Sequence, residues 1–61
     1  MPALIAALRD VERQVRLAAV DALATIGRPA KSAIDPLWHL IRDPDEDVRD
    51  RALRAIRLIK G

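Results

Sequence analysis

The feature that most constrains the fold of this 61-residue chain is an internal repeat with a period of 33 residues. When residues 1–28 are aligned with residues 34–61, eight of the 28 positions are identical, and eight of the others are apolar in both copies. The identical residues are Leu4, Arg9, Asp10, Val15, Arg16, Ala19, Ala22 and Ile26, each of which recurs 33 positions later. Such a period is typical of arrays in which one small unit stacks on the next. We therefore expect one domain, 1–61, made of a first repeat at 1–27, truncated at its start, and a second at 28–61.

Each repeat is predicted to form a pair of helices. The apolar residues are mainly Ala, Leu, Ile and Val without an alternating strand pattern, and Ala and Leu are strong helix formers. The expected helices span residues 1–9, 11–26, 29–42 and 44–59. Asp10 and Asp43 are the expected N-caps of the second helices, Gly27 is an expected left-handed C-cap, and Pro36 is expected to bend its helix. The predicted fold class is all-α, an α-solenoid of about two helical hairpins (four helices).

The turn inside each repeat carries an Asp and, six positions later, an Arg: Asp10 with Arg16, and Asp43 with Arg49. The first helix of the second repeat also contains a proline, Pro36. The apolar positions around these residues are Leu4, Leu8, Val15, Ala19, Ala22, Leu23 and Ile26, then Ile34, Leu37, Leu40, Ile41, Val48, Ala52, Ile56 and Ile59. With these residues nearly the whole chain resembles HEAT repeats, most closely the short HEAT-like class found in phycobilisome lyases and in consensus-designed repeat proteins.

The resemblance implies a non-catalytic scaffold, because HEAT arrays serve many different partners. It also implies a structural ladder of turn residues. Arg16 would bind Asp10 of its own repeat or an acidic turn residue of the next repeat, and Arg49 would bind Asp43 in the same way. Family arrays stack several units, so the short chain leaves a second origin open: a designed repeat protein or an excised fragment with no natural function.

The first repeat has little polar cover. Residues 1–8 contain no polar side chain, and Leu17, Ala18 and Ala24 stand where the second repeat has charged residues. Exposed apolar patches mark interfaces, and the ends of repeat arrays need polar caps. The sequence therefore predicts self-association through the first repeat, most simply as a two-fold homodimer, or else a face once covered by a preceding repeat. The expected interface residues are Met1, Leu4, Ile5, Leu8, Leu17, Val20 and Ala24.

The last helix offers a different candidate surface, a basic patch formed by Arg51, Arg54, Arg57 and Lys60. Such a strip could meet phosphates, so nucleic-acid binding is the alternative function. The net charge of only +2 and the lack of an aromatic residue for base stacking in the last helix argue against it.

The sequence provides little for catalysis or for a prosthetic group. It has no Cys, a single His39, one Ser and one Thr, so we expect neither an enzyme nor a metal site, and no cofactor or small-molecule substrate. Trp38 is expected to be a packing anchor, and His39 is expected to face solvent. No apolar stretch is long enough to span a membrane, and we expect a soluble chain. The compartment stays open, although a chain without Cys is compatible with the cytoplasm.

Overall fold

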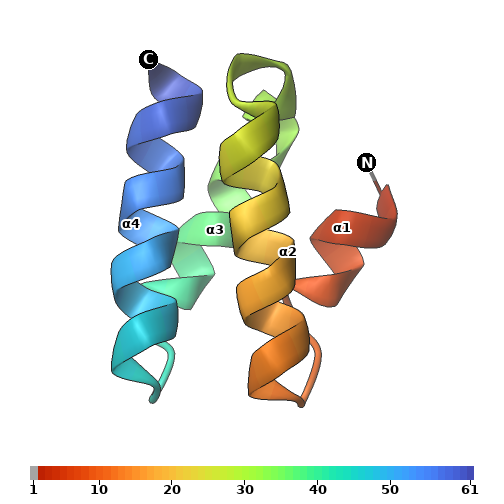
Figure 1. Cartoon of the computed structure of the whole chain (residues 1–61), viewed down its shortest axis with the longest axis vertical. Helices are drawn as coiled ribbons and strands as arrows, with labels where there is room; N and C mark the ends of the chain where they lie inside the picture. The colour runs from red at the N-terminus through yellow and green to blue at the C-terminus, as the bar shows by residue number, and fades with distance from the viewer. Residues whose placement is uncertain (1) are drawn as a thin grey trace.

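The computed structural model describes residues 2–61, and within them it contains helices and no strands, which confirms the all-α prediction (Figure 1). The elements are α1 (Pro2–Ala7), α2 (Arg13–Ile26), the 3-10 helix η1 (Arg28–Ala33), α3 (Ile34–Leu40) and α4 (Glu46–Lys60). Figure 1 shows α2 between α4 and α1, with α3 behind the pair formed by α2 and α4. The second helices of the two repeats, α2 and α4, thus lie side by side and form one face of the molecule.

Both long helices begin two residues later than predicted, because Asp10 and Asp43 shape the turn before the helix and do not cap it. The Oδ1 atom of Asp10 accepts the backbone N–H of Glu12 at 2.9 Å, and Oδ1 of Asp43 accepts that of Asp45 at 2.9 Å. A side chain bonded two residues ahead forms an Asx turn, which competes with helical geometry. The N-cap of α4 is Asp45, whose Oδ1 accepts the N–H of Val48 at 3.2 Å.

The predicted helix over 29–42 is divided in two, and the division lies before Pro36. η1 winds as a 3-10 helix with Ala30 at φ −88° and ψ 23°, and α3 then starts at Ile34. Pro36 is the third residue of α3, so its missing N–H falls in the first turn, where no partner is needed. A regular helix through this point would set the proline ring against the carbonyl of Ser32, which explains why the helix restarts here and does not merely bend.

Gly27 ends α2 as predicted, with its N–H bonded to the carbonyl of Leu23 at 3.0 Å. Its φ of 73° is positive, but its ψ of −137° lies outside the left-handed helical region, so the expected left-handed cap is wrong in detail. This backbone conformation is open almost only to glycine, and it turns the chain sharply from α2 into η1.

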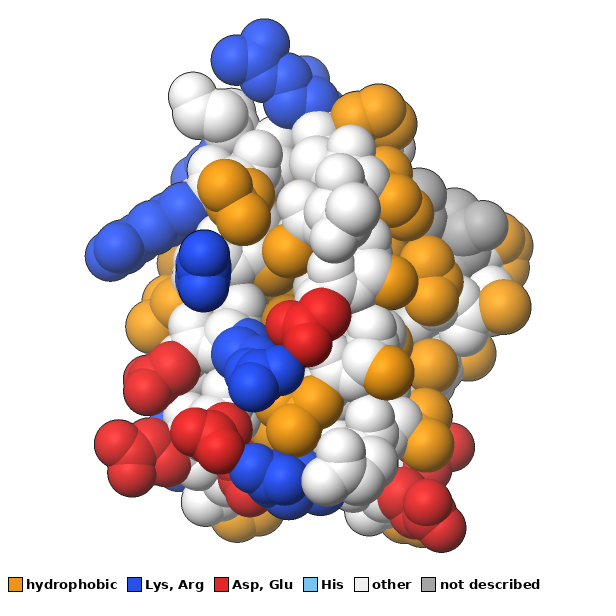
Figure 2. Space-filling model, in the orientation of Figure 1, with side chains coloured by type: hydrophobic (Ala, Val, Ile, Leu, Met, Phe, Trp, Pro, Cys, Tyr) orange, Lys and Arg blue, Asp and Glu red, His pale blue; other side chains and the backbone are white. Residues whose placement is uncertain are grey.

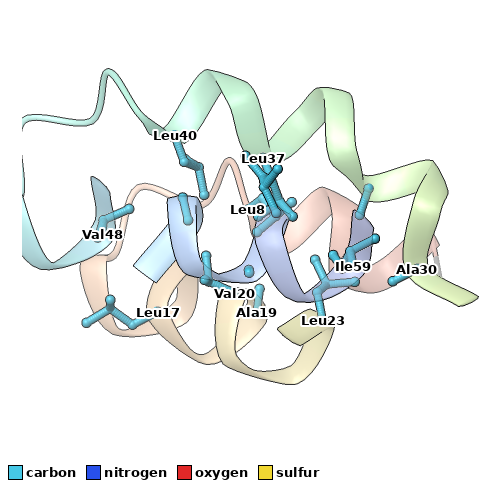
Figure 3. Packing of buried hydrophobic residues seen from close by; sticks show 14 residues of the cluster. Leu8, Leu17, Ala19, Val20, Leu23, Ala30, Leu37, Leu40, Val48 and Ile59 are labelled. Atoms are coloured by element: carbon cyan, nitrogen blue, oxygen red, sulfur yellow. The ribbon is translucent and has the colours of Figure 1, made fainter. Parts of the chain in front are cut away.

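The core is built entirely from Ala, Val, Leu and Ile side chains, contributed by α2, η1, α3, α4 and Leu8, which follows α1 (Figure 3). From α4 it takes Val48, Ala52, Ala55, Ile56 and Ile59. With these small and branched side chains α4 packs against α2, α3 and η1. No helix within residues 2–61 combines the length and apolar character needed to cross a bilayer.

Candidate interaction surface

Four apolar positions are buried in the second repeat but open in the first. Leu37, Val48, Ala55 and Ile59 are each 0% exposed. The equivalent residues, 33 positions earlier, are Leu4, Val15, Ala22 and Ile26; the first three are half-buried and Ile26 is 39% exposed. The difference arises because the first repeat covers the second on this side, while nothing in residues 2–61 covers the first. We call Leu4, Val15, Ala22 and Ile26 the open face.

Figure 2 places hydrophobic side chains along the flank formed by α1 and α2, on the right of the view, and gathers the charged side chains mainly over α4. The open face therefore belongs to an apolar edge of the molecule. None of its four residues is ionisable, and Ala18, an exposed residue of α2, lies in the same helix between Val15 and Ala22. A continuous apolar flank of this kind is what an interface presents.

Three residues expected at the interface lie in the core instead. Leu8, Leu17 and Val20 are 1%, 6% and 0% exposed, so the prediction that they form a free surface is wrong. Leu17 and Val20 lie on α2, which packs against α4 of the second repeat. The pattern of a helix that is apolar on several sides could not reveal which side is covered. Of the other expected residues, Leu4 belongs to the open face, Ile5 and Ala24 are half-buried, and Met1 lies outside the described residues.

The opposite end of the molecule presents charges at the positions that are apolar in the first repeat. The residues equivalent to Leu17, Val20 and Ala24 are Asp50, Leu53 and Arg57, and we call these three the charged face. Asp50 and Arg57 are exposed and Leu53 is 38% exposed. The two ends of this small solenoid therefore differ in chemistry.

The structure brings the four turn residues of the expected ladder into contact. Nη1 of Arg16 donates to the carbonyl oxygens of Asp10 at 2.9 Å and Val11 at 3.0 Å. Nη1 of Arg49 donates to the equivalent carbonyls, those of Asp43 at 2.8 Å and Pro44 at 3.2 Å. Each Arg therefore ties its helix to the turn that precedes it through the backbone, and not through the carboxylate of its own repeat.

The other edge of the Arg16 guanidinium links the two repeats. Its Nε lies 2.9 Å from Oδ2 of Asp43, and its Nη2 donates to Oδ1 at 3.4 Å. The Arg16 and Asp43 side chains are only 15% and 7% exposed, so this is the most buried ion pair among the described residues. Arg49 has no equivalent carboxylate partner within residues 2–61.

Two further sets of ion pairs cross the junction between the repeats near the surface. Arg13 bonds to Asp45 and, at 2.7 Å, to Asp47, while Arg51 bonds to Asp21 at 2.7 Å. Their exposure makes each worth little to stability, although both sets connect α2 to α4 or to its N-cap.

Asp45 is held in its charged form by these contacts. Burial raises the pKa of its carboxyl, but hydrogen bonds from Arg13 and from the N–H of Val48, with the charge of Arg13, outweigh burial and bring the pKa below its ordinary value of 3.8. A carboxyl with a lowered folded-state pKa adds stability above its unfolded pKa, and this contribution is lost as the pH falls through the folded value.

We therefore expect Asp45→Asn to be less stable than the wild type near neutral pH, because asparagine keeps the N-cap but loses the charge. The difference in free energy of unfolding should shrink below about pH 4. Urea denaturation of both proteins over a pH series measures it, and a difference that stays constant into strong acid would contradict the expectation.

The predicted basic patch is divided by the structure. Arg51 turns toward the first repeat and pairs with Asp21, whereas Arg54, Arg57 and Lys60 are exposed and have no carboxylate partner within residues 2–61. Arg51 and Arg54 border a shallow groove of about 510 Å³ between α2 and α4. Its lining residues are Asp21, Ala24, Thr25, Arg51, Arg54 and Leu58.

Trp38 and His39 lie next to each other at the surface. Trp38 is 41% exposed beside His39, so its expected role as a packing anchor is wrong, whereas His39 is exposed as predicted. The Thr25 hydroxyl donates to the carbonyl of Asp21 at 3.0 Å. In the part of the chain that the structure describes, no three His, Asp or Glu side chains are grouped closely enough to hold a metal ion.

Comparison with known proteins agrees with the geometry. The family of HEAT repeats matches residues 1–61, the whole chain. No curated protein and no solved structure matches the chain significantly. HEAT repeats generally act as non-catalytic scaffolds for protein–protein interaction. The match, the helical hairpins and the turn arginines that recur after 33 residues together show that this chain belongs to the HEAT repeat family.

Proposed function

We propose that this chain is a protein-interaction module that assembles with a second copy of itself through the open face of its first repeat. The observation that carries the proposal is the difference between equivalent positions: Leu37, Val48, Ala55 and Ile59 are fully buried, and Leu4, Val15, Ala22 and Ile26 are not. In this assembly residues 1–27 and 28–61 would be the two repeats of each copy. A partner placed against the open face would restore the cover that the second repeat already has.

The stacking of repeats favours the same conclusion. A single helical repeat cannot bury its own apolar face, and each added neighbour extends a continuous core. A homodimer would join two short arrays into one of about four repeats with a continuous core. Assembly would therefore stabilise the fold as well as form the interface.

Light scattering over a wide dilution series tests the proposal. We expect a molar mass of about twice 6.8 kDa at high concentration, and a decrease toward 6.8 kDa on dilution. Ala22→Glu should stay at 6.8 kDa throughout, because dimerisation would bury an unpaired carboxylate. Ser32→Glu adds the same charge at an exposed site in η1 and should behave like the wild type. A wild-type chain that is monomeric at high micromolar concentration would contradict the proposal and favour an excised or designed fragment.

Phosphate or nucleic-acid binding is the second candidate, and it rests on the three exposed, unpaired cations Arg54, Arg57 and Lys60 of α4. Arg51 contributes less, because its charge is balanced by Asp21. Binding of a duplex oligonucleotide that weakens steeply with added salt would support this function, and its absence would remove it.

A further inference from the structure

We infer that the assembly closes as a two-fold dimer, because the charged face of the second repeat prevents further copies from stacking head to tail. This inference rests on the proposed function and adds the geometry of the partner. A two-fold dimer uses the same surface on both copies and stops at two, whereas a head-to-tail contact joins different surfaces and continues into a filament.

The contacts of a head-to-tail junction follow from those already present inside the chain. In such a junction the first repeat of one copy would pack on the second repeat of another copy. The packing would be the same as that between the two repeats inside one chain. Each residue of the first repeat is then replaced by the one 33 positions later, and each residue of the second by the one 33 positions earlier in the next copy.

The ion pairs that Arg13 makes would be lost in this junction. Arg13 and its partner Asp45 become Glu46 and Glu12 of the next copy, which places two carboxylates together where an ion pair stands. The partner Asp47 becomes Gln14, which is uncharged. None of these three equivalent residues is a cation, so none would relieve the repulsion between the two carboxylates.

Only one of the remaining ion pairs would survive. The pair of Asp21 with Arg51 becomes Arg54 with Ala18, in which no partner carboxylate remains. The pair of Arg16 with Asp43 becomes Arg49 with Asp10 of the next copy, and this contact alone is preserved.

Apolar packing would be lost as well. Leu17 and Val20 are 6% and 0% exposed at the internal junction, and their equivalents are Asp50 and Leu53. Ala24 is replaced by Arg57. A head-to-tail contact would therefore take two charged side chains out of water with no partner provided by the equivalent positions, which is strongly unfavourable.

A two-fold contact avoids these costs. It sets the open face of one copy, Leu4, Val15, Ala22 and Ile26, against the same uncharged face of the other. Asp50 and Arg57 then stay in water at the two outer ends of the dimer, where polar residues are needed. The open face of a second copy thus matches the open face in its lack of charge, whereas the charged face does not.

Two glutamate substitutions on opposite faces distinguish the arrangements. Ala18→Glu puts a charge beside the open face, and Leu53→Glu puts one on the charged face. Both sites are exposed, and circular dichroism verifies that each variant keeps its helices. For a two-fold dimer we expect Ala18→Glu to weaken association by at least about a hundredfold, and Leu53→Glu to leave it within about threefold.

Head-to-tail stacking predicts the opposite pattern. Leu53→Glu would then be monomeric, whereas Ala18→Glu would keep or strengthen association, because the new carboxylate would lie beside Arg54 of the neighbouring copy as Asp21 lies beside Arg51. This pattern, or a wild-type mass that grows beyond two chains with concentration, would overturn the inference while leaving self-association in place. A wild-type chain that never dimerises would instead contradict the proposed function, and the two-fold dimer with it.

A gain-of-function variant tests the reason for closure. Glu46→Arg, Asp50→Leu and Arg57→Ala together give the second repeat the residues that the first repeat has at these three positions. We expect the triple variant to form species larger than a dimer whose mass rises with concentration. A folded triple variant that stops at a dimer would show that these charges do not limit stacking, and would overturn the inference.

Discussion

Replacing Asp43 with alanine is expected to lower the free energy of unfolding by about 3 kcal/mol, because it leaves a largely buried guanidinium without its partner. Arg16 is 15% exposed and its Nε lies 2.9 Å from the Asp43 carboxylate, so water cannot fully replace the lost charge. The substitution also removes the hydrogen bond from the N–H of Asp45, which shapes the turn before α4. A chain of this size is stable by roughly 3 to 9 kcal/mol, so the loss is a large part of the total.

Asp10→Ala is the matched control, since Asp10 is the equivalent residue of the first repeat. It accepts the N–H of Glu12 in the same way but has no cation partner within residues 2–61. We expect its loss to cost about 1 kcal/mol, the value of one such hydrogen bond. Urea denaturation at one fixed protein concentration compares the two variants. Equal losses would show that the ion pair to Arg16 adds nothing beyond the turn.

Leu37→Ala is expected to cost about 3 kcal/mol by leaving a cavity at the centre of the core. Leu37 is 0% exposed and lies among the residues that join α3 to α4 (Figure 3). Its equivalent in the first repeat, Leu4, is half-buried on the open face, so Leu4→Ala should cost only about 1 kcal/mol in the monomer.

The stability costs of Leu4→Ala and Leu37→Ala should respond differently to the protein concentration. If a second copy covers the open face, the cost of Leu4→Ala should increase with concentration, because the truncated side chain also weakens the dimer that stabilises the fold. Leu37 is covered within its own chain, so the cost of Leu37→Ala should change less. Thermal unfolding of both variants at low and high concentration measures this. A concentration-independent cost for Leu4→Ala would argue against cover of this residue by a second chain.

The backbone departs from the expected helices at places where a local side chain competes with helical geometry. Asp10 and Asp43 were expected as caps because Asp favours both caps and turns, and sequence alone does not tell which hydrogen bond forms. Pro36 was expected to bend a helix, but the chain satisfies the proline by restarting the helix just before it. In both cases the residue type indicated that a helix begins nearby. The residue at which the helix begins depended on which of the competing local structures forms.

Sequence by itself determined the repeat, the helical class and the family, because all of these follow from the spacing of residues along one chain. The side of α2 that the second repeat covers could only be decided by the tertiary structure. Leu17 and Val20 are as apolar as Val15 and Ile26, yet the first two are buried and the others are partly open. The direction in which one helical hairpin stacks on the next makes that difference, since it covers one flank of the first repeat and leaves the other partly open.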